Sequence, residues 1–426
     1  MRNPTIAFTL TVLLLSACSA PGEERGGDPG ATGGVGPLTF VTGRDTTAYL
    51  QPLLDGWNAA HPAERVTLLE LPEAADEQRA QMVANLQAGS DRYDVLGLDV
   101  VWTAEFADAG WIIPLDRTRF PLDRFLKPVV DTAVYRGKLW AVPYSSNAGL
   151  LYYRKDLLDK AGLRPPRTWE ELRTEARQLS GRSGKHDIGG YAGQFLAYEG
   201  LIVNFAEAVQ SAGGEIRSSD DGTVTMDADK AKTGLDLLLR GFREGWIPQE
   251  ALTYKEEESR LAFQEGRLLF ARNWPHAYGP ATRSPVAGKF AVTRLPGLKG
   301  PGSGSLGGLN LAVSAYSKRQ KSALEFIRYF TDLPNQRRLL TEGSFPPVWA
   351  ELYDDPALIK RFPYLPVLKE SILAARPRPA GPNYNQVSLA ITSSVARALT
   401  PPFKESSDDV IASLKSELDE LNRTRG

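Results

Sequence analysis

The chain has 426 residues, of which 42% are apolar and 24% charged, and its formal net charge is −1. This near-neutral balance argues against a nucleic-acid-binding surface, which would leave an excess of basic residues. The single cysteine excludes an intramolecular disulfide framework and a cysteine-based zinc site.

A targeting segment opens the chain. Arg2 precedes an apolar run from Ile6 to Leu15, which has signal-peptide length and is too short to span a bilayer. The run ends in Leu15-Ser16-Ala17-Cys18, the bacterial lipobox pattern, in which the cysteine becomes the acylated first residue of the mature chain. We therefore predict a lipoprotein signal peptide over residues 1–18, with Cys18 as the membrane anchor. An ordinary signal peptide with an incidental cysteine is the alternative.

A flexible tether is expected next, because residues 19–37 are mostly Gly, Pro, Ala and charged residues. The rest of the chain is too long for one core and suggests two domains. Its first part alternates strands and helices, which predicts an α/β fold with a parallel sheet and right-handed crossovers. The expected elements are strands at 38–41, 65–71 and 95–98, and helices at 49–57, 75–88 and 101–109, the last ending at Gly110.

Further elements follow a proposed second α/β unit over residues 152–295. Thr168-Trp169-Glu170-Glu171 has capping-box spacing and predicts a helix through Leu179. A strand is expected at Leu309–Val313, then a helix capped by Ser317. That helix has Ala323, Phe326, Ile327 and Phe330 on its apolar face. Beyond Pro346 the chain reads as helical and punctuated by prolines.

Two apparent motifs carry no function. Gly302 to Gly307 fits the dinucleotide fingerprint, but it precedes a strand instead of linking a strand to a helix. The three histidines His61, His186 and His276 are scattered, so we expect surface or loop positions and no metal site. No cofactor is expected.

Polar and aromatic groups stand at the predicted strand ends, where ligands of α/β sheets bind. Asp99 follows the third strand, and the loop 42–45 follows the first. The loop 142–147 is rich in hydrogen-bonding side chains, and Trp274 precedes a proline at a strand end. Sugar recognition needs this mixture of carboxylates, amides and a flat aromatic ring. A simple helix-dipole role for Asp99 and a turn role for the loop 142–147 remain open.

A family resemblance runs through the mature chain. The segments that carry it are Asp76-Glu77-Gln78-Arg79, Leu98 to Trp111 (LDVVWTAEFADAGW), Leu150 to Leu158 (LLYYRKDLL), Tyr198-Glu199-Gly200-Leu201, Arg260 to Pro275 (RLAFQEGRLLFARNWP), Gly307 to Val313 (GGLNLAV) and Arg378 to Tyr384 (RPAGPNY). They resemble family 1 extracellular solute-binding proteins of ABC sugar importers, in the maltose-binding protein superfamily. Within it, the chain is most similar to actinobacterial trehalose-binding lipoproteins.

The resemblance implies a two-lobed, type II periplasmic-binding-protein fold with a ligand cleft between the lobes. The N-terminal lobe would comprise residues 38–147 and 296–345, and the C-terminal lobe residues 148–295 and 346–426. It further implies an extracytoplasmic, lipid-anchored monomer that closes around a sugar by hinge motion. Its partners would be ABC permease subunits with their ATPase, and no nucleic acid.

The resemblance also implies a set of cleft residues. These are Asp99, Asn147, Glu256, Trp274, Gly308 and Arg378, with Arg44, Asp45 and Gln78 as weaker candidates. Glu256 is preferred to Glu257 and Glu258 because it lies four residues before the Arg-Leu-Ala-Phe match, and we expect two of the three glutamates to be solvated. Arg378 is preferred to Arg376 because it begins the Arg-Pro-x-x-Pro-x-Tyr pattern. Gly381 replaces a small hydroxyl residue of the family, which puts one hydrogen bond in doubt.

The expected ligand is an α-linked disaccharide, with trehalose ahead of maltose. The alternative from another class is a lipid-anchored glycoside hydrolase with Asp99 and Glu256 as its acid pair. A nearby Arg378 argues against it, because an arginine keeps a carboxylate ionised and unfit as a general acid. An adhesive or structural lipoprotein is a third reading, which no repeat supports.

Overall fold

The computed structural model describes residues 33–44, 48–183 and 186–424. The predicted signal peptide, Cys18 and Asp45 lie outside this part of the chain. From Gly34 on the chain already contacts a lobe, because the Gly34 amide donates to Lys318 O (2.8 Å) and the Gly36 amide to Ser322 Oγ (3.0 Å). No helix of the described residues is long and apolar enough to cross a membrane.

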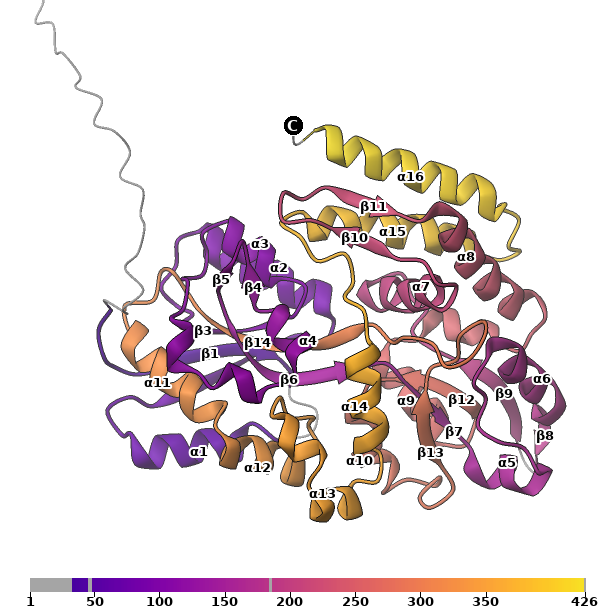
Figure 1. Cartoon of the computed structure of the whole chain (residues 1–426), viewed down its shortest axis with the longest axis horizontal. Helices are drawn as coiled ribbons and strands as arrows, with labels where there is room; N and C mark the ends of the chain where they lie inside the picture. The colour runs from indigo at the N-terminus through magenta and orange to yellow at the C-terminus, as the bar shows by residue number, and fades with distance from the viewer. Residues whose placement is uncertain (1–32, 45–47, 184–185, 425–426) are drawn as a thin grey trace, which may run out of the picture.

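Two five-stranded sheets organise two lobes (Figure 1). The first lobe is built on the sheet β2-β1-β3-β14-β6, and the second lobe on the sheet β13-β7-β12-β9-β8. The strands of the first sheet are β1 (Leu38–Gly43), β2 (Val66–Leu71), β3 (Val95–Asp99), β6 (Val142–Ala148) and β14 (Leu306–Val313). Those of the second are β7 (Leu150–Tyr153), β8 (Gly181–Ser183), β9 (His186–Ala192), β12 (Leu268–Asn273) and β13 (Ala291–Arg294). Two short hairpins pair β4 (Val134–Tyr135) with β5 (Lys138–Leu139) and β10 (Ile216–Ser218) with β11 (Val224–Met226).

The parallel pairing predicted for the first three strands of the chain is confirmed, and the first sheet also contains antiparallel pairs. β1 pairs in parallel with β2 and β3, as the alternation of strands and helices predicted. β14 instead runs antiparallel to both β3 and β6. It enters from the second lobe and not through a helical crossover within its own sheet, so the right-handed crossover rule does not govern its direction.

Helices cover both sheets (Figure 1). The first lobe carries α1 (Gln51–Ala60), α2 (Ala75–Gln87), α3 (Thr103–Asp108), α4 (Lys127–Asp131), α11 (Gln320–Phe330) and α12 (Leu333–Gly343), with short 3-10 turns η1 (Arg117–Arg119) and η2 (Leu122–Arg124). The second carries α5 (Lys155–Ala161), α6 (Trp169–Leu179), α7 (Glu199–Ser211), α8 (Ala228–Arg243), α9 (Glu256–Gln264), α10 (Tyr278–Ala281), α15 (Tyr384–Ala398) and α16 (Ser407–Arg423), with η3 (Gln249–Thr253) and η4 (Pro275–Ala277). Between the lobes run η5 (Ala350–Tyr353), α13 (Pro356–Arg361) and α14 (Leu365–Ala374).

Local sequence rules place most helix starts correctly. The capping box at α6 is confirmed, because Thr168 Oγ1 accepts from the Glu171 amide and Glu171 returns a carboxylate oxygen to the Thr168 amide. The predicted cap Ser317 is wrong, since α11 begins after Arg319. Ser317 Oγ instead donates to Asp94 Oδ1 (2.6 Å), a fully buried carboxylate. Because the Ser317 hydroxyl bonds to this distant carboxylate, Ser317 is not the N-cap of the helix.

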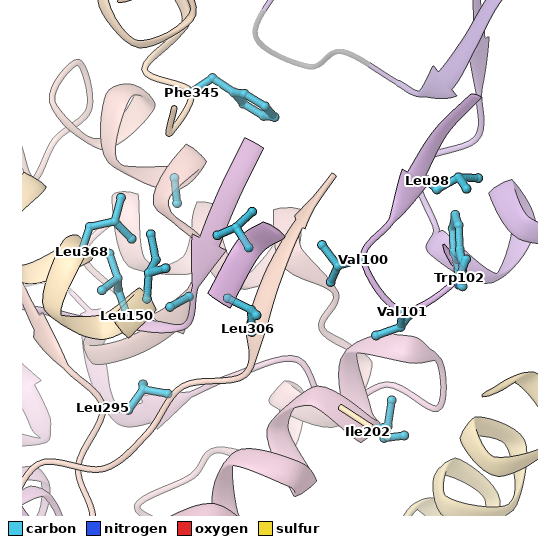
Figure 2. Packing of buried hydrophobic residues seen from close by; sticks show 14 of the residues in the cluster. Leu98, Val100, Val101, Trp102, Leu150, Ile202, Leu295, Leu306, Phe345 and Leu368 are labelled. Carbon is cyan, nitrogen blue, oxygen red and sulfur yellow. The ribbon is translucent and has the colours of Figure 1, made fainter. Parts of the chain in front are cut away.

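The lobes join where the chain changes sheets. β6 passes to β7 at Gly149, β13 passes to β14 through residues 295–305, and α14 packs against both β6 and β13. Figure 2 shows apolar side chains of these crossings, among them Leu150, Leu295, Leu306 and Leu368. All four belong to one buried core cluster that extends into both lobes.

A buried ion pair anchors two of these crossings. Arg272 Nη2 lies 2.6 Å from Glu207 Oε1, and the two side chains are 1% and 4% exposed. The same Glu207 oxygen accepts from the Ser305 amide (2.9 Å). A Cβ at Gly149 would lie 2.3 Å from it, so only glycine fits at that crossing. The Arg272–Glu207 ion pair therefore holds the crossing at Gly149 and the crossing at Ser305 against the second lobe.

Candidate ligand-binding cleft

A cavity of about 240 Å³ lies between the lobes. It is lined by Thr42, Gly43, Arg44, Tyr49, Glu73, Ala75, Gln78, Asp99, Trp102, Asn147, Tyr198, Glu199, Gly200, Val203, Glu256, Glu257, Trp274, His276, Gly307, Gly308, Leu309, Phe345 and Arg378. Every cleft residue expected from sequence that the structure describes is in this set. They come from strand ends and helix starts of both sheets, as ligand sites of α/β folds do.

The cleft residues of the first lobe lie on its strands. Asp99 is the last residue of β3, and Asn147 lies on β6 opposite Gly307 of β14. Gly308 has φ +136, and a Cβ there would lie 2.3 Å from Ser145 O. Its contribution to the cleft is thus the close approach of β14 to β6, and glycine is required for it.

The second lobe holds Trp274 and Glu256 in one hydrogen-bonded unit. Asn273, which is 1% exposed, donates from Nδ2 to Glu256 O (3.0 Å) and accepts from the Trp274 amide (2.8 Å). The Tyr198 hydroxyl donates to Glu256 Oε2 (2.5 Å). These bonds hold the main chain of both cleft residues and the carboxylate of Glu256.

The indole of Trp274 is also fixed from behind. The Arg272 guanidinium carbon stands 3.9 Å from the centroid of the Trp274 ring and covers one face of it. A Cβ at Gly307 would lie 2.8 Å from the ring, so the glycine lets β14 pack directly on the indole. Trp274 remains half-buried, which fits an aromatic surface for a ligand and not a core residue.

Arg378 joins the two lobes across the cleft. Its Nη2 lies 2.6 Å from Asp99 Oδ1, and its Nη1 donates to Glu199 Oε1. Glu199 also accepts from the Tyr384 hydroxyl and from Ser388 Oγ (2.9 Å). Burial, together with the negative charge of Asp99, raises the pKa of Glu199 to about 7 against the opposing pull of Arg378. Arg378 is 2% exposed and Asp99 21% exposed, so the guanidinium is shielded from solvent while the Asp99 carboxylate still reaches the cleft.

Sequence reasoning missed several lining residues. Tyr198 and Glu199 stand in a segment already cited for the resemblance, so attention to its polar positions would have found them. Tyr49 and Phe345, whose rings stack at 4.1 Å, come together only in the fold. Their separation along the chain left no local pattern to detect.

The expectations for His276 and for the glutamate run need correction. His276 lines the cavity and is not a mere surface histidine; its Nε2 lies 3.8 Å from Glu257 Oε1. Glu257 lines the cavity beside Glu256, so only Glu258 is exposed. Burial alone would raise the pKa of Glu257, but the nearby His276 and the Arg260 guanidinium, which donates to the carboxylate, lower it to about 2. No group of three or more His, Cys, Asp or Glu side chains among the described residues is arranged to hold a metal ion.

Comparison with known proteins identifies the class. The model of the bacterial extracellular solute-binding protein family matches residues 42–337. The chain belongs to this family. A probable ABC transporter-binding protein of Deinococcus radiodurans is 37% identical over 363 residues, covering 81% of this chain and 84% of that protein.

Solved structures agree on the fold. The maltose-bound MalE3 of T. maritima superposes with a TM-score of 0.84 at 33% identity, over 90% of this chain and 99% of that one. The GacH receptor of Streptomyces glaucescens, solved unliganded and with acarbose, gives 0.79 at 23% identity over 91% and 99%. The protein therefore has the two-lobed α/β fold of periplasmic sugar-binding proteins.

Membership of this family makes the chain an extracytoplasmic solute-binding protein and not an enzyme.

Proposed function

We propose that this protein captures an α-linked glucose disaccharide, trehalose ahead of maltose, and delivers it to the permease of an ABC importer. The coarser assignment, a carbohydrate-binding protein of an ABC-type importer, follows from the family and from its sugar-bound relatives. Among those relatives are the maltose-bound MalE3 and a lactose-binding protein of Rhizobium radiobacter, 22% identical over 358 residues.

One observation supports the disaccharide proposal above the rest. A single cavity between two lobes gathers carboxylates, an amide, an arginine and an indole. Asn147 Oδ1 is buried there and has no hydrogen-bond partner among the described residues. A buried acceptor without a partner costs free energy, and a ligand hydroxyl would satisfy it. The half-buried ring of Trp274 would cover the apolar C–H face of the sugar.

Closure of the lobes would complete the site. Asp99, Asn147 and Gly308 are carried by the first lobe, and Glu256 and Trp274 by the second. A sugar that contacts both sets stabilises the closed form, because an open form offers it only one set. We propose residues 38–147 with 296–345, and 148–295 with 346–426, as the two moving bodies.

The permease partner and the anchor belong to the same proposal. The closed form is the state that the membrane subunits would recognise, and acylated Cys18 would keep the monomeric binding protein beside them. Replacing Cys18 with Ala should release the protein from the membrane while its affinity for sugar in solution stays unchanged. Continued membrane association of Cys18→Ala would contradict the lipobox assignment.

The ligand assignment is tested by competition titration of trehalose, maltose, sucrose and glucose against one protein sample. Trehalose and maltose should bind more tightly than sucrose and glucose. A site built on paired hydroxyls rejects analogues that leave its buried groups unpaired. If a β-linked sugar or a monosaccharide binds more tightly than both α-disaccharides, the ligand proposal is wrong and the binding-protein assignment stands.

A further inference from the structure

A second cavity, of about 650 Å³, also lies between the lobes. Its walls include Val100, Thr132 and Tyr135 of the first lobe, and Ser218, Asp220 and Arg376 from the other side. Neighbouring residues of the chain line different cavities. Asp99 and Gly307 line the sugar cavity, whereas the adjacent Val100 and Leu306 line the second cavity. Val100 and Leu306 are both labelled in Figure 2.

The boundary between the two cavities consists of main-chain hydrogen bonds and of one side chain. The Val100 amide donates to Gly308 O (3.3 Å), and the Leu306 amide donates to Arg376 O (2.8 Å), so the strands close the backbone part. Arg378 lines both cavities. Its guanidinium, which meets Asp99 on one side and Glu199 on the other, is the side-chain part.

Contacts between the lobes also bridge the second cavity at Asp220. The Tyr135 hydroxyl donates to Asp220 O (3.0 Å), and the Arg136 amide donates to Asp220 Oδ2 (3.3 Å). These contacts join the β4–β5 hairpin to the turn between β10 and β11. The second cavity, called the chamber below, therefore lies between the lobes and is open to solvent at exposed residues such as Arg376, and the Arg378–Asp99 ion pair stands between it and the sugar cavity.

We infer that the Asp99–Arg378–Glu199 cluster is a wall that limits the length of the bound sugar, and that a longer α-glucan would enter the chamber if this wall were removed. The inference rests on the proposed function. Small-ligand pockets span about 300–1,000 Å³, so a sugar cavity of about 240 Å³ lies just below that range. A third ring would have to displace a buried ion pair, and breaking such a pair is costly.

Removal of the wall can be designed from either lobe. The double variant Arg378→Ala/Glu199→Gln deletes the guanidinium and leaves no unpaired carboxylate at position 199. The glutamine oxygen can still accept from one of the hydroxyls of Tyr384 and Ser388, and the glutamine amide can donate to the other. The variant Asp99→Ala removes the other half of the wall while Glu199 keeps Arg378 in place, so it remains informative if the double variant fails to fold. Arg376→Ala is the matched control, because Arg376 is exposed and lines only the chamber.

The experiment is calorimetric titration of each protein with trehalose, maltose, maltotriose and maltotetraose. Wild type and Arg376→Ala should bind both longer sugars about tenfold or more weakly than maltose. The wall variants should lose affinity for maltose, and their maltotriose-to-maltose ratio should shift at least about fivefold toward maltotriose. Comparing the maltotriose-to-maltose affinity ratio distinguishes a change in the preferred sugar length from a general loss of affinity.

Two results would overturn the inference alone: wild-type protein that binds maltotetraose as tightly as maltose, or folded wall variants with an unchanged ratio. If wild type binds neither trehalose nor maltose, the proposed function is overturned and the length limit with it. Disaccharide binding by wild type thus distinguishes failure of the wall from failure of the proposed function.

Discussion

The two sides of the cleft are prepared for a ligand in different ways. On the second lobe, Tyr198 holds Glu256, Asn273 holds Trp274, and Arg272 covers one face of the indole. On the first lobe, Asn147 Oδ1 is buried and has no hydrogen-bond partner in the part of the chain that the structure describes. The second side is therefore a preorganised surface, which reduces the entropic cost of binding. The first side has an acceptor that a ligand can satisfy on closure.

The largest expected effect comes from removing the support beneath the preorganised side. Glu207→Ala leaves Arg272 charged, buried and unpaired, and should lower the free energy of unfolding by about 3–5 kcal/mol. Urea denaturation measures it. The control is Glu325→Ala, whose ion pairs with Arg119 and Arg328 lie at the surface and should contribute about 0–1 kcal/mol. Equal, small losses in both variants would contradict the anchoring role of Glu207.

Truncation of the aromatic surface should affect binding and not folding. Trp274→Ala should weaken sugar binding by about 1–3 kcal/mol, as expected for the loss of one aromatic platform, with the melting temperature nearly unchanged. Titration calorimetry and a thermal melt measure the two. Trp111, half-buried in the first lobe and outside the cavity, is the matched control, and Trp111→Ala should keep wild-type affinity. Unchanged affinity or unfolding of Trp274→Ala would make this indole a core residue.

A pair of asparagines tests the contrast between the two sides directly. Asn147→Ala should weaken sugar binding by about 1 kcal/mol, the net value of one hydrogen bond, without lowering the free energy of unfolding. Asn273→Ala should lower both quantities, because Asn273 already bonds to Glu256 and Trp274 in the free protein. If Asn147→Ala destabilises the free protein as much as Asn273→Ala does, the two sides do not differ in the way described.

The last expected effect is a dependence of stability on pH that arises from Glu199. Burial raises its pKa to about 7 in the folded protein, from a usual value of 4.5. A raised carboxyl pKa stabilises the fold most below about pH 4.5, and that contribution falls as pH rises toward 7. The slope stays under about 1.4 kcal/mol per pH unit for one proton. Glu199→Gln should lack this slope in urea denaturation between pH 5 and 7, and parallel curves for the two proteins would contradict the raised pKa.

Local pattern was enough for the strands and helices predicted at the start of the first lobe and for part of the cleft, and the family resemblance supplied the other cleft residues. The capping box at Thr168 and the apolar spacing of Ala323, Phe326, Ile327 and Phe330 depend on neighbours within one or two turns, and all four of these side chains are fully buried. Asp99 was found because the end of a strand is a local feature, and the ligand side of an α/β sheet follows from it.

The direction of β14, the hydrogen bond of Ser317 and the position of His276 follow from contacts that no local pattern contains. Each depends on a partner far away in the chain: β14 meets β3, Ser317 meets Asp94, and His276 meets Glu257 across a helix start. The wall at Arg378 depends on three separate segments that supply Asp99, Glu199 and Arg378. The residue types at the ends of strands and helices can be predicted from sequence, because they follow from local periodicity. Which of these residues meet depends on long-range packing and on the desolvation of charges, and these leave no periodic pattern in a single sequence.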